Sequence, residues 1–226
     1  MDNNTTLLEV NSLYKTYDKA LVKALNGLTF SLKKGKIYAI MGSSGCGKST
    51  LLNLIGTLDN ADSGKILYEG KEIHKFDDIS LFRREYIGFV FQFHYLIPVL
   101  TLKENIETAM LLNKHYTPQQ REQRAIKLLK QMGLDDKIDA RANKVSGGQR
   151  QRAAIARAMA NNPKLILADE PTGNVDSQTS AMILKHLKEY VKRLNTTMLI
   201  ATHDPNVAAI ADETFYMQDG QIVDKV

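Results

Sequence analysis

Short apolar runs alternate with segments of helical periodicity along most of the chain. Continuous apolar runs are typical of strands that a parallel sheet buries on both faces, and they lie at residues 37–41, 164–168 and 197–201. The expected helices cover residues 51–55, with a stop near Gly56, then 148–161 and 177–194. Short buried strands separated by helices predict the α/β class with a parallel sheet.

The two ends and the middle of the chain follow other patterns. Further strands are expected over 7–13, 25–32, 64–70 and 85–91, and a closing hairpin over 214–217 and 221–226. In the middle, Thr117-Pro118-Gln119-Gln120 is a capping box with proline at the first helical position, and Gly133 ends that helix. We expect one domain over residues 1–226, with a mostly helical insertion at about 93–145.

Composition narrows the class of protein. The chain has 226 residues, of which 43% are hydrophobic, enough for the core of one globular domain. Its apolar runs are far shorter than the roughly 20 residues of a membrane-spanning helix. The N-terminus is polar, so no signal peptide is expected. Cys46 is the one cysteine and has no internal disulfide partner, which favours a reducing cytosol.

The positive charge is concentrated in one segment. The net charge is +5, and residues 114–157 hold 11 Lys and Arg against 4 Asp and Glu. Such a segment can attract nucleotide, nucleic acid or an anionic membrane surface. It can equally be a solvated helical face. Both interpretations stay open at the level of sequence.

A glycine-rich loop stands between the first apolar strand and the helix that follows. Gly42-Ser43-Ser44-Gly45-Cys46-Gly47-Lys48-Ser49 matches the phosphate-loop pattern in full and in the right context. Its backbone N–H groups and the helix N-terminus would wrap a phosphate, while Lys48 reaches the β- and γ-phosphates. Ser49 would bind Mg²⁺, and Thr50 the α-phosphate. We expect the Cys46 thiol to be open to maleimide when no nucleotide is bound.

Two carboxylates follow the apolar strand at 165–168. Strand ends of a parallel sheet meet at the ligand crevice, so Asp169 is expected to face the Mg²⁺ that Ser49 holds. Adjacent strand residues point to opposite faces, so Glu170 is aimed differently. It is a candidate general base that positions a water against the γ-phosphate.

A third motif is more specific than either of these. Val145-Ser146-Gly147-Gly148-Gln149 opens a helix shortly before the acidic strand. With this signature the chain resembles ATP-binding-cassette (ABC) ATPases over essentially its whole length. The resemblance implies a P-loop NTPase core with an ABC-type antiparallel β subdomain and an inserted α-helical subdomain. It also implies ATP and Mg²⁺ as ligands, and ATP hydrolysis as the activity.

The resemblance implies roles for further residues. Gln92 looks like the Q-loop glutamine that contacts Mg²⁺ and the attacking water, and His203 like the switch histidine at the γ-phosphate. Tyr17 is placed like the aromatic residue that stacks on adenine, with Tyr14 as a competitor. The implied catalytic residues are Glu170, His203, Gln92 and Lys48; the implied metal ligands are Ser49, Gln92 and Asp169. The signature adds Ser146, Gly147, Gly148 and Gln149 as nucleotide contacts.

Two stretches, 168–174 and 93–105, are similar to the lipoprotein-release, macrolide-export and FtsE-type branch. That branch implies an integral membrane permease as partner and a peripheral position on the cytoplasmic face of the inner membrane. It also implies an ATP-bound homodimer, in which Ser146 and Gly148 of one chain cap the γ-phosphate held by the other. No nucleic-acid partner is expected. Alternatives are a connector with weak ATPase activity or a soluble nucleic-acid-associated ABC protein, while a phosphate-loop kinase or GTPase would lack the signature.

The segment after Gln92 is unusually apolar for a loop. Its large side chains are Phe93, Tyr95, Leu96, Ile97, Val99 and Leu100, and Pro98 keeps it out of regular structure. Either the domain's own helices cover these side chains or another protein does. We expect the second, because the segment adjoins Gln92 and so would link a membrane partner to the nucleotide.

Overall fold

The computed structural model describes residues 5–18 and 21–226, and its largest element is a six-stranded sheet. The strand order is β10 (Gln221–Lys225), β9 (Glu213–Gln218), β3 (Ile37–Met41), β8 (Thr197–Thr202), β7 (Leu165–Asp169) and β6 (Ile87–Val90). All neighbours pair in parallel except β10 and β9, which form the C-terminal hairpin. The apolar runs are therefore the central strands of a parallel sheet, as predicted.

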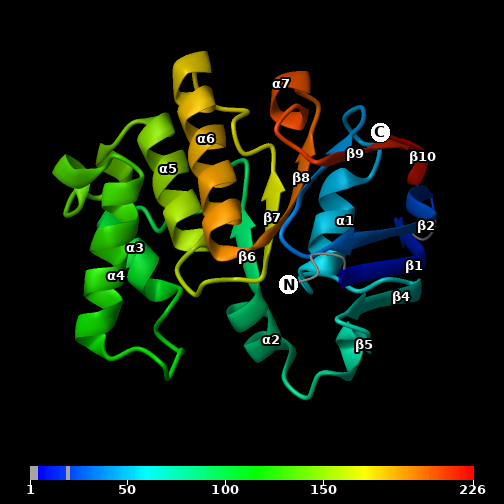
Figure 1. The fold of residues 1–226 in the computed structure, drawn as a ribbon, viewed down its shortest axis with the longest axis horizontal. Coiled ribbons are helices and arrows are strands. Elements are labelled where there is room, and N and C mark those ends of the chain that lie inside the picture. Colours follow the sequence, from blue (N-terminus) through cyan, green and yellow to red (C-terminus); the bar gives the residue numbers. More distant parts are fainter. Residues whose placement is uncertain (1–4, 19–20) are drawn as a thin grey trace.

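A second, antiparallel sheet lies at one end of the molecule, and the helix that follows β3 lies between the two sheets (Figure 1). Its order is β2 (Val22–Lys33), β1 (Thr6–Tyr17), β4 (Ser63–Tyr68) and β5 (Lys71–Glu72). The helix, α1 (Lys48–Ile55), buries Leu51, Leu52, Leu54 and Ile55 in a core shared by both sheets.

The remaining helices are α2 (Ile79–Tyr86), α3 (Leu102–Thr108), α4 (Pro118–Gln131), α5 (Gly147–Ala158), α6 (Ser177–Leu194) and α7 (Pro205–Ala208). Helix α2 buries Phe82 in the core shared with α1, whereas α3–α7 contribute to the core on the other face of the parallel sheet. Short 3-10 turns lie at Ile73–Lys75, Asp135–Lys137 and Ala142–Lys144. Figure 1 shows α3, α4 and α5 gathered at the end opposite the antiparallel sheet. The predicted class, with its antiparallel subdomain and helical insertion, is confirmed.

The alternation of side chains along β7 explains how one strand serves two cores. Ile166 and Ala168 point into the core made with α3–α6, while Leu165 and Leu167 point into the core made with α1. Successive strand residues face opposite sides, so a strand buried on both sides needs apolar residues throughout. The fold therefore rests on two cores that share one sheet.

One predicted strand begins too early. Residues 85 and 86 end helix α2, and β6 starts only at Ile87. The signal that was missed is Asp78, whose carboxylate accepts a hydrogen bond from the Leu81 backbone at 2.9 Å and caps α2. The capping box at Thr117 and the stop at Gly133, where φ is +61°, match the prediction for α4.

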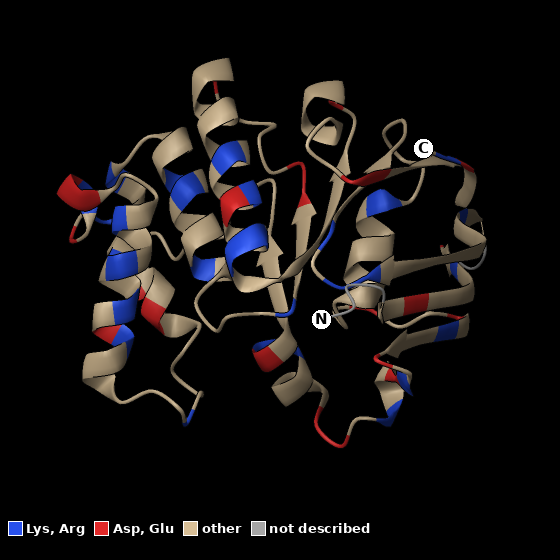
Figure 2. Cartoon of the chain, viewed as in Figure 1, with Lys and Arg blue, Asp and Glu red and all other residues tan. Residues whose placement is uncertain are grey.

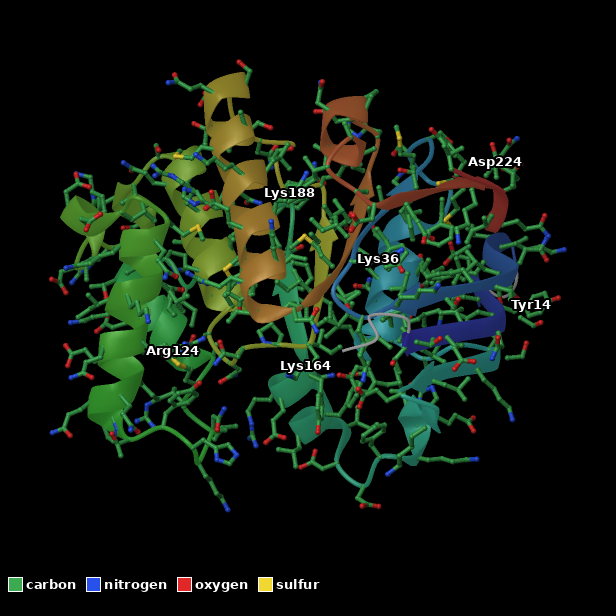
Figure 3. The ribbon with its side chains drawn as sticks, viewed as in Figure 1. Tyr14, Lys36, Arg124, Lys164, Lys188 and Asp224 are labelled. Atoms are coloured by element: carbon green, nitrogen blue, oxygen red, sulfur yellow. The ribbon has the colours of Figure 1, made fainter. Side chains whose placement is uncertain are left out.

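The basic segment has a structural use that the sequence alone does not reveal. Figure 2 shows its Lys and Arg residues spread along α4 and α5. Arg124, labelled in Figure 3, donates to the carbonyls of Met159 and Ala160 at the end of α5. Arg152 donates to those of Met132 and Gly133 at the end of α4. Helix C-termini carry unpaired carbonyls and partial negative charge, so each arginine ties the middle of its own helix to the C-terminal end of the other.

Helix α5 packs unusually closely against β6, and a glycine permits the approach. A Cβ atom on Gly88 would lie 2.4 Å from the Ala158 carbonyl oxygen and 2.9 Å from Pro163. A backbone oxygen cannot move away without displacing the helix that carries it. Gly88 thus determines how closely α5 packs against the sheet.

We predict that Gly88→Ala lowers the free energy of unfolding by about 1–3 kcal/mol, because the added methyl group overpacks this contact. Urea unfolding followed by circular dichroism measures the change. Val223→Ala, at an exposed strand position, is the control and should stay within about 0.5 kcal/mol of the wild type. An unchanged urea midpoint for Gly88→Ala would contradict the close packing of α5 on β6.

Candidate nucleotide-binding site

A cavity of about 610 Å³ opens where the carboxyl ends of β3, β7 and β8 meet the end of β1. Most of the predicted site residues line it together: Tyr17, Ser43, Ser44, Gly45, Gly47, Lys48, Ser49, Thr50, Gln92, Asp169, Glu170 and His203. Val22 and Ala24 also line it and were not predicted. Strands of a parallel sheet place their C-terminal loops at one edge, which is why segments so far apart in sequence meet here.

The glycine-rich loop takes a path that only glycine allows at its last turn. Gly47 has φ +107°, and a Cβ atom there would lie 2.2 Å from the Ala24 carbonyl oxygen. The loop leads directly into α1, whose first residues, Lys48, Ser49 and Thr50, line the cavity, and the first backbone N–H groups of a helix have no partner within it. Lys48 is buried, and its ammonium donates to the Gly42 and Ser43 carbonyls at 2.7 and 2.9 Å. The Lys48 ammonium is therefore held beside the glycine-rich loop, where it can attract an anion.

The two carboxylates after β7 do point in different directions. Asp169 faces the Ser49 hydroxyl; burial raises the pKa of Asp169, the nearby hydroxyl opposes that rise, and the charge of Glu170 adds to it. Glu170 has a left-handed backbone, with φ +44°, which turns its side chain towards β8. Its carboxylate accepts from the Thr202 hydroxyl at 2.9 Å and from the His203 backbone N–H at 3.0 Å.

His203 and Gln92 reach the cavity from different strands. His203 Nδ1 lies 2.6 Å from the Glu170 carboxylate, so the histidine ring and the acid form a pair. Gln92 follows β6, and its backbone carbonyl accepts a hydrogen bond from the Asn174 side chain at 2.9 Å. Asn174 was not expected to have this role; it ties the loop after Glu170 to the loop that carries Gln92.

Of the two tyrosines considered for the cavity, only Tyr17 lines it. Tyr14 lies against Gly27, where a Cβ atom would be 2.8 Å from its hydroxyl oxygen, and it is the labelled tyrosine in Figure 3. Tyr17 is the last residue of β1, with its hydroxyl bonded to Asp59. The structure therefore favours Tyr17 over Tyr14 as the aromatic residue of this site.

Gly42 and Cys46 belong to the loop but do not line the cavity, and the expectation about the thiol is wrong. Cys46 is 6% exposed and packs in the same core as α1. A Cβ atom on Gly42 would lie 2.7 Å from its sulfur, so the thiol fills the space beneath the loop. These two residues can meet a ligand only through their backbone atoms.

The signature residues lie outside this cavity, at the start of α5. Ser146 caps the helix: its hydroxyl accepts from the Gln149 backbone at 3.3 Å, and the Gln149 side chain accepts from the Ser146 backbone at 2.9 Å. The motif is therefore also a capping box. Gly147 and Gly148 occupy the first turn of α5, where backbone N–H groups lack partners within the helix.

The donors around Ser49 suit a small divalent cation bound together with phosphates. Mg²⁺ prefers oxygen ligands and usually binds through one or two protein groups plus phosphate oxygens. The Ser49 hydroxyl, the Asp169 carboxylate and Gln92 all line the same cavity, and the hydroxyl lies near the carboxylate. Within residues 5–18 and 21–226, no three His, Cys, Asp or Glu side chains gather to hold a metal alone. The phosphates of a nucleotide would have to complete the coordination.

A phosphate loop at a helix N-terminus, facing carboxylates at the ends of parallel strands, defines a P-loop nucleotide-binding protein. Residues 25–173 match the ABC transporter family, and the chain belongs to that family. It is an ATP-binding cassette that hydrolyses ATP, as the resemblance implied.

Several known proteins are similar to almost the whole of this chain. The lipoprotein-releasing system ATP-binding protein LolD 2 of Chlorobaculum tepidum is 38% identical, covering 96% of this chain and 91% of that protein. The macrolide export ATP-binding/permease protein MacB of Nitrosomonas europaea is 42% identical, and the match covers 96% of this chain but 33% of MacB. The cassette MJ0796, solved as a dimer bound to ADP and Pi, is 37% identical with a TM-score of 0.91, covering 97% of this chain and 98% of that one. The predicted LolD/MacB branch is confirmed.

We predict that maleimide labels native Cys46 far more slowly than it labels free glutathione at the same pH, because the thiol is packed beneath the loop. Labelling should accelerate through the urea unfolding transition, and ATP should have little direct effect on it. Mass spectrometry of timed samples measures the rate, and Cys46→Ala controls for labelling at other groups. Rapid labelling of the folded protein would contradict the buried position of the sulfur.

Proposed function

We propose that this chain is the ATP-hydrolysing subunit of a membrane machine of the lipoprotein-release or macrolide-export type, working as a dimer on a permease partner. One observation supports it above all. Three separate segments bring a phosphate loop, a cation-suited Ser49–Asp169 pair and a Glu170–His203 pair into one cavity. We also propose that residues 1–226 act as one cassette, peripheral to the cytoplasmic face of the cell membrane.

The residues divide the work of phosphoryl transfer among them. Lys48 and the loop N–H groups hold the β- and γ-phosphates, and Thr50 the α-phosphate. Ser49, Asp169 and Gln92 hold Mg²⁺, which supplies positive charge against the phosphates when bound. Glu170 accepts a proton from water as the water oxygen attacks the γ-phosphorus. The bond to the bridging oxygen then breaks, which leaves ADP and phosphate.

His203 orients the acid in this scheme. Its ring nitrogen and its backbone N–H both contact the same Glu170 oxygen, while Thr202 contacts the other. These three contacts fix the carboxylate against rotation. A general base acts only from a fixed position within hydrogen-bond reach of the proton it accepts.

The signature completes the site from a second copy. Ser146, Gly147 and Gly148 open a 12-residue helix away from the cavity of their own chain, so they present a second anion cradle to another molecule. The relative MJ0796 has been solved as a dimer, which supports this arrangement. ATP shared between two copies would hold the dimer closed, and hydrolysis would release it.

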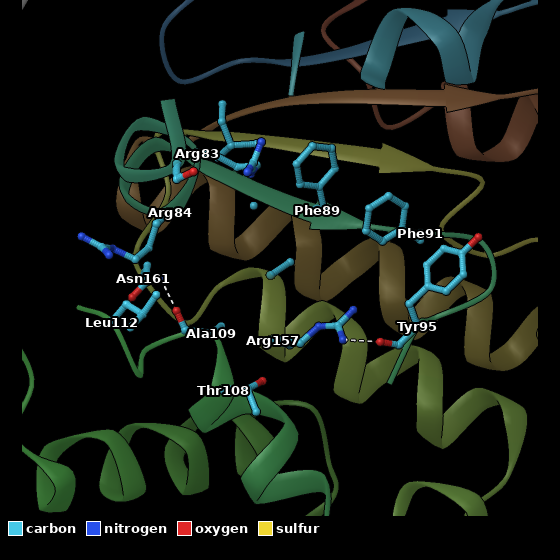
Figure 4. Close-up of a pocket in the computed structure, with 14 residues that line it drawn as sticks. Arg83, Arg84, Phe89, Phe91, Tyr95, Thr108, Ala109, Leu112, Arg157 and Asn161 are labelled. Atoms are coloured by element: carbon cyan, nitrogen blue, oxygen red, sulfur yellow. Dashed lines mark hydrogen bonds between the residues drawn. The ribbon is translucent and has the colours of Figure 1, made fainter. Parts of the chain in front are cut away.

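The membrane partner has a candidate docking groove of about 510 Å³ on the surface of this chain, shown in Figure 4. Phe89, Phe91, Tyr95 and Leu112 line it, with Arg157 beneath. Tyr95 is 62% exposed and Leu112 74%, so the groove offers large apolar surface at the Q-loop side of the molecule. In the described part of the chain no helix is long and apolar enough to cross a membrane. We infer that a segment of the permease fills this groove.

Only some side chains of the apolar segment after Gln92 are exposed. Phe93, Tyr95, Ile97 and Val99 are exposed, whereas Leu96 packs against the helical core. Buried Asn105 fastens the loop backbone to α3: its side chain accepts from the Ile97 N–H at 2.7 Å and donates to the Ile97 and Thr101 carbonyls. Leu96 is therefore part of the core, and variants that test the partner belong at Tyr95 and Leu112.

We predict that Glu170→Gln binds ATP but hydrolyses it at least about 100-fold more slowly, since the amide cannot accept the proton. The variant should accumulate as an ATP-bound dimer, seen by light scattering after size exclusion. Phosphate release gives the rate. Glu69→Gln, at an exposed carboxylate paired with Lys34, is the matched control and should turn over normally. Near-normal turnover by Glu170→Gln would contradict its role as the base.

We predict that Tyr95→Ala and Leu112→Asp weaken co-purification with the permease from native membranes and reduce permease-stimulated ATP hydrolysis. The isolated variants should keep their urea midpoints, because both side chains are exposed. Val223→Asp is the matched control: it places a charge at an exposed apolar position on the opposite edge of the sheet. If both groove variants co-purify with the permease and respond to it normally, the permease binds elsewhere on the chain.

A further inference from the structure

A small polar network holds the aromatic residue at the mouth of the nucleotide cavity. Lys15 and Tyr17, two residues apart on β1, both turn to Asp59, which lies in the loop after α1. The Tyr17 hydroxyl donates to one carboxylate oxygen at 2.7 Å, and the Lys15 ammonium donates to the other at 2.9 Å. Lys15 also donates to the Asn60 carbonyl at 2.7 Å.

The charges in this network support one another. Burial opposes the ionisation of Asp59, yet the hydrogen bonds that join it to Tyr17 and Lys15 hold the pKa of Asp59 below its ordinary value. Burial likewise opposes the charge on Lys15, but Asp59 raises the pKa of Lys15 above its ordinary value. Burial and the bond to Asp59 raise the pKa of Tyr17. At neutral pH the network is therefore a lysine cation, a carboxylate and a neutral phenol that donates.

The network fixes the orientation of the ring. Lys15 Nζ lies 5.0 Å from the centre of the Tyr17 ring, and Lys15 is only 9% exposed. The Thr50 side chain, next after Ser49 on α1, also lies near the Tyr17 hydroxyl and opposes the rise in its pKa. The ring thus lines the cavity while its hydroxyl is tied to Asp59 in the loop after α1.

We propose that Asp59, itself held by Lys15, is a positioning residue that presents the Tyr17 ring as a preformed platform for the base of the nucleotide. A free tyrosine at a strand end would lose rotamer freedom when a base stacks on it, and the tether removes that loss before binding. The hydrogen bond between Asp59 and Tyr17 should therefore strengthen the binding of the base and leave the binding of the phosphate chain unchanged. This inference rests on the proposed function of Tyr17 as the residue that meets adenine.

The test compares ATP with inorganic tripolyphosphate, which carries the phosphates without a base. Each is measured with Mg²⁺ by displacement of a fluorescent ATP analogue. We expect Asp59→Ala and Tyr17→Phe each to weaken ATP binding about 3- to 10-fold, as for release of one immobilised side chain, with tripolyphosphate binding unchanged. KM for ATP should rise more than kcat falls. Asp59→Asn, whose carbonyl can still accept from the phenol, should recover part of the affinity.

The double variant separates a tether from two independent effects. If Asp59 acts through the Tyr17 hydroxyl, Asp59→Ala combined with Tyr17→Phe should bind ATP no more weakly than the worse single variant. Asp139→Ala removes an exposed carboxylate paired with Lys103 and is the matched control, with no expected effect on either ligand. Urea midpoints check that each variant is folded. If Asp59→Ala does not fold, Tyr17→Phe still tests the inference, because it removes the other partner of the same hydrogen bond.

Three outcomes would overturn the inference: unchanged ATP affinity in Asp59→Ala and Tyr17→Phe, equal weakening of ATP and tripolyphosphate, or a double variant whose loss is the product of the single losses. A wild-type protein that binds ATP no better than tripolyphosphate would also overturn it, with the phosphate site left intact. A wild-type protein that binds neither ligand would instead refute the proposed function.

Discussion

Everything in this molecule depends on the packing of α1 between two sheets. The helix buries its leucines in a core formed by the parallel sheet on one side and the antiparallel sheet on the other. The loop before it must then pass between β3 and the antiparallel sheet, close to the Ala24 carbonyl and Met217. Gly47 fits this passage because any side chain would collide with a backbone atom. The same constraint that closes the core therefore shapes the anion cradle.

The parallel sheet determines where the proposed catalytic side chains lie. Glu170 and His203 follow neighbouring strands, β7 and β8, and the Glu170 backbone N–H donates to the Ala201 carbonyl of β8, so the two residues are held close together. The left-handed conformation of Glu170 turns the acid towards His203, while Asp169 remains directed at Ser49. Such a conformation is costly for a residue with a side chain and persists where the surroundings demand it. Two adjacent carboxylates thereby serve two chemical roles.

The segment after Gln92 is joined to α5 by a half-buried arginine. Arg157, near the end of α5, donates to the carbonyls of His94 and Tyr95, which both have left-handed backbones just after Gln92. Burial lowers the pKa of Arg157, and the two carbonyls are the groups that receive its hydrogen bonds. The helix that opens with the signature is thus fastened, at its other end, to the segment that connects the groove with the nucleotide. Motion at one would be felt at the other through this contact.

The amino-acid sequence by itself determined the class of the fold, the phosphate loop, the paired carboxylates and the family. Those signals are local: a buried parallel strand must be apolar throughout, and an anion cradle needs glycines at fixed spacing. The tertiary structure alone decided which way side chains face and what they meet across the chain. It turned the Cys46 thiol inwards, separated Leu96 from its exposed neighbours, and brought Asp59 to Tyr17 over 42 positions. It also used the basic segment to cap helices. These outcomes depend on close packing between distant segments, and no local pattern records that packing.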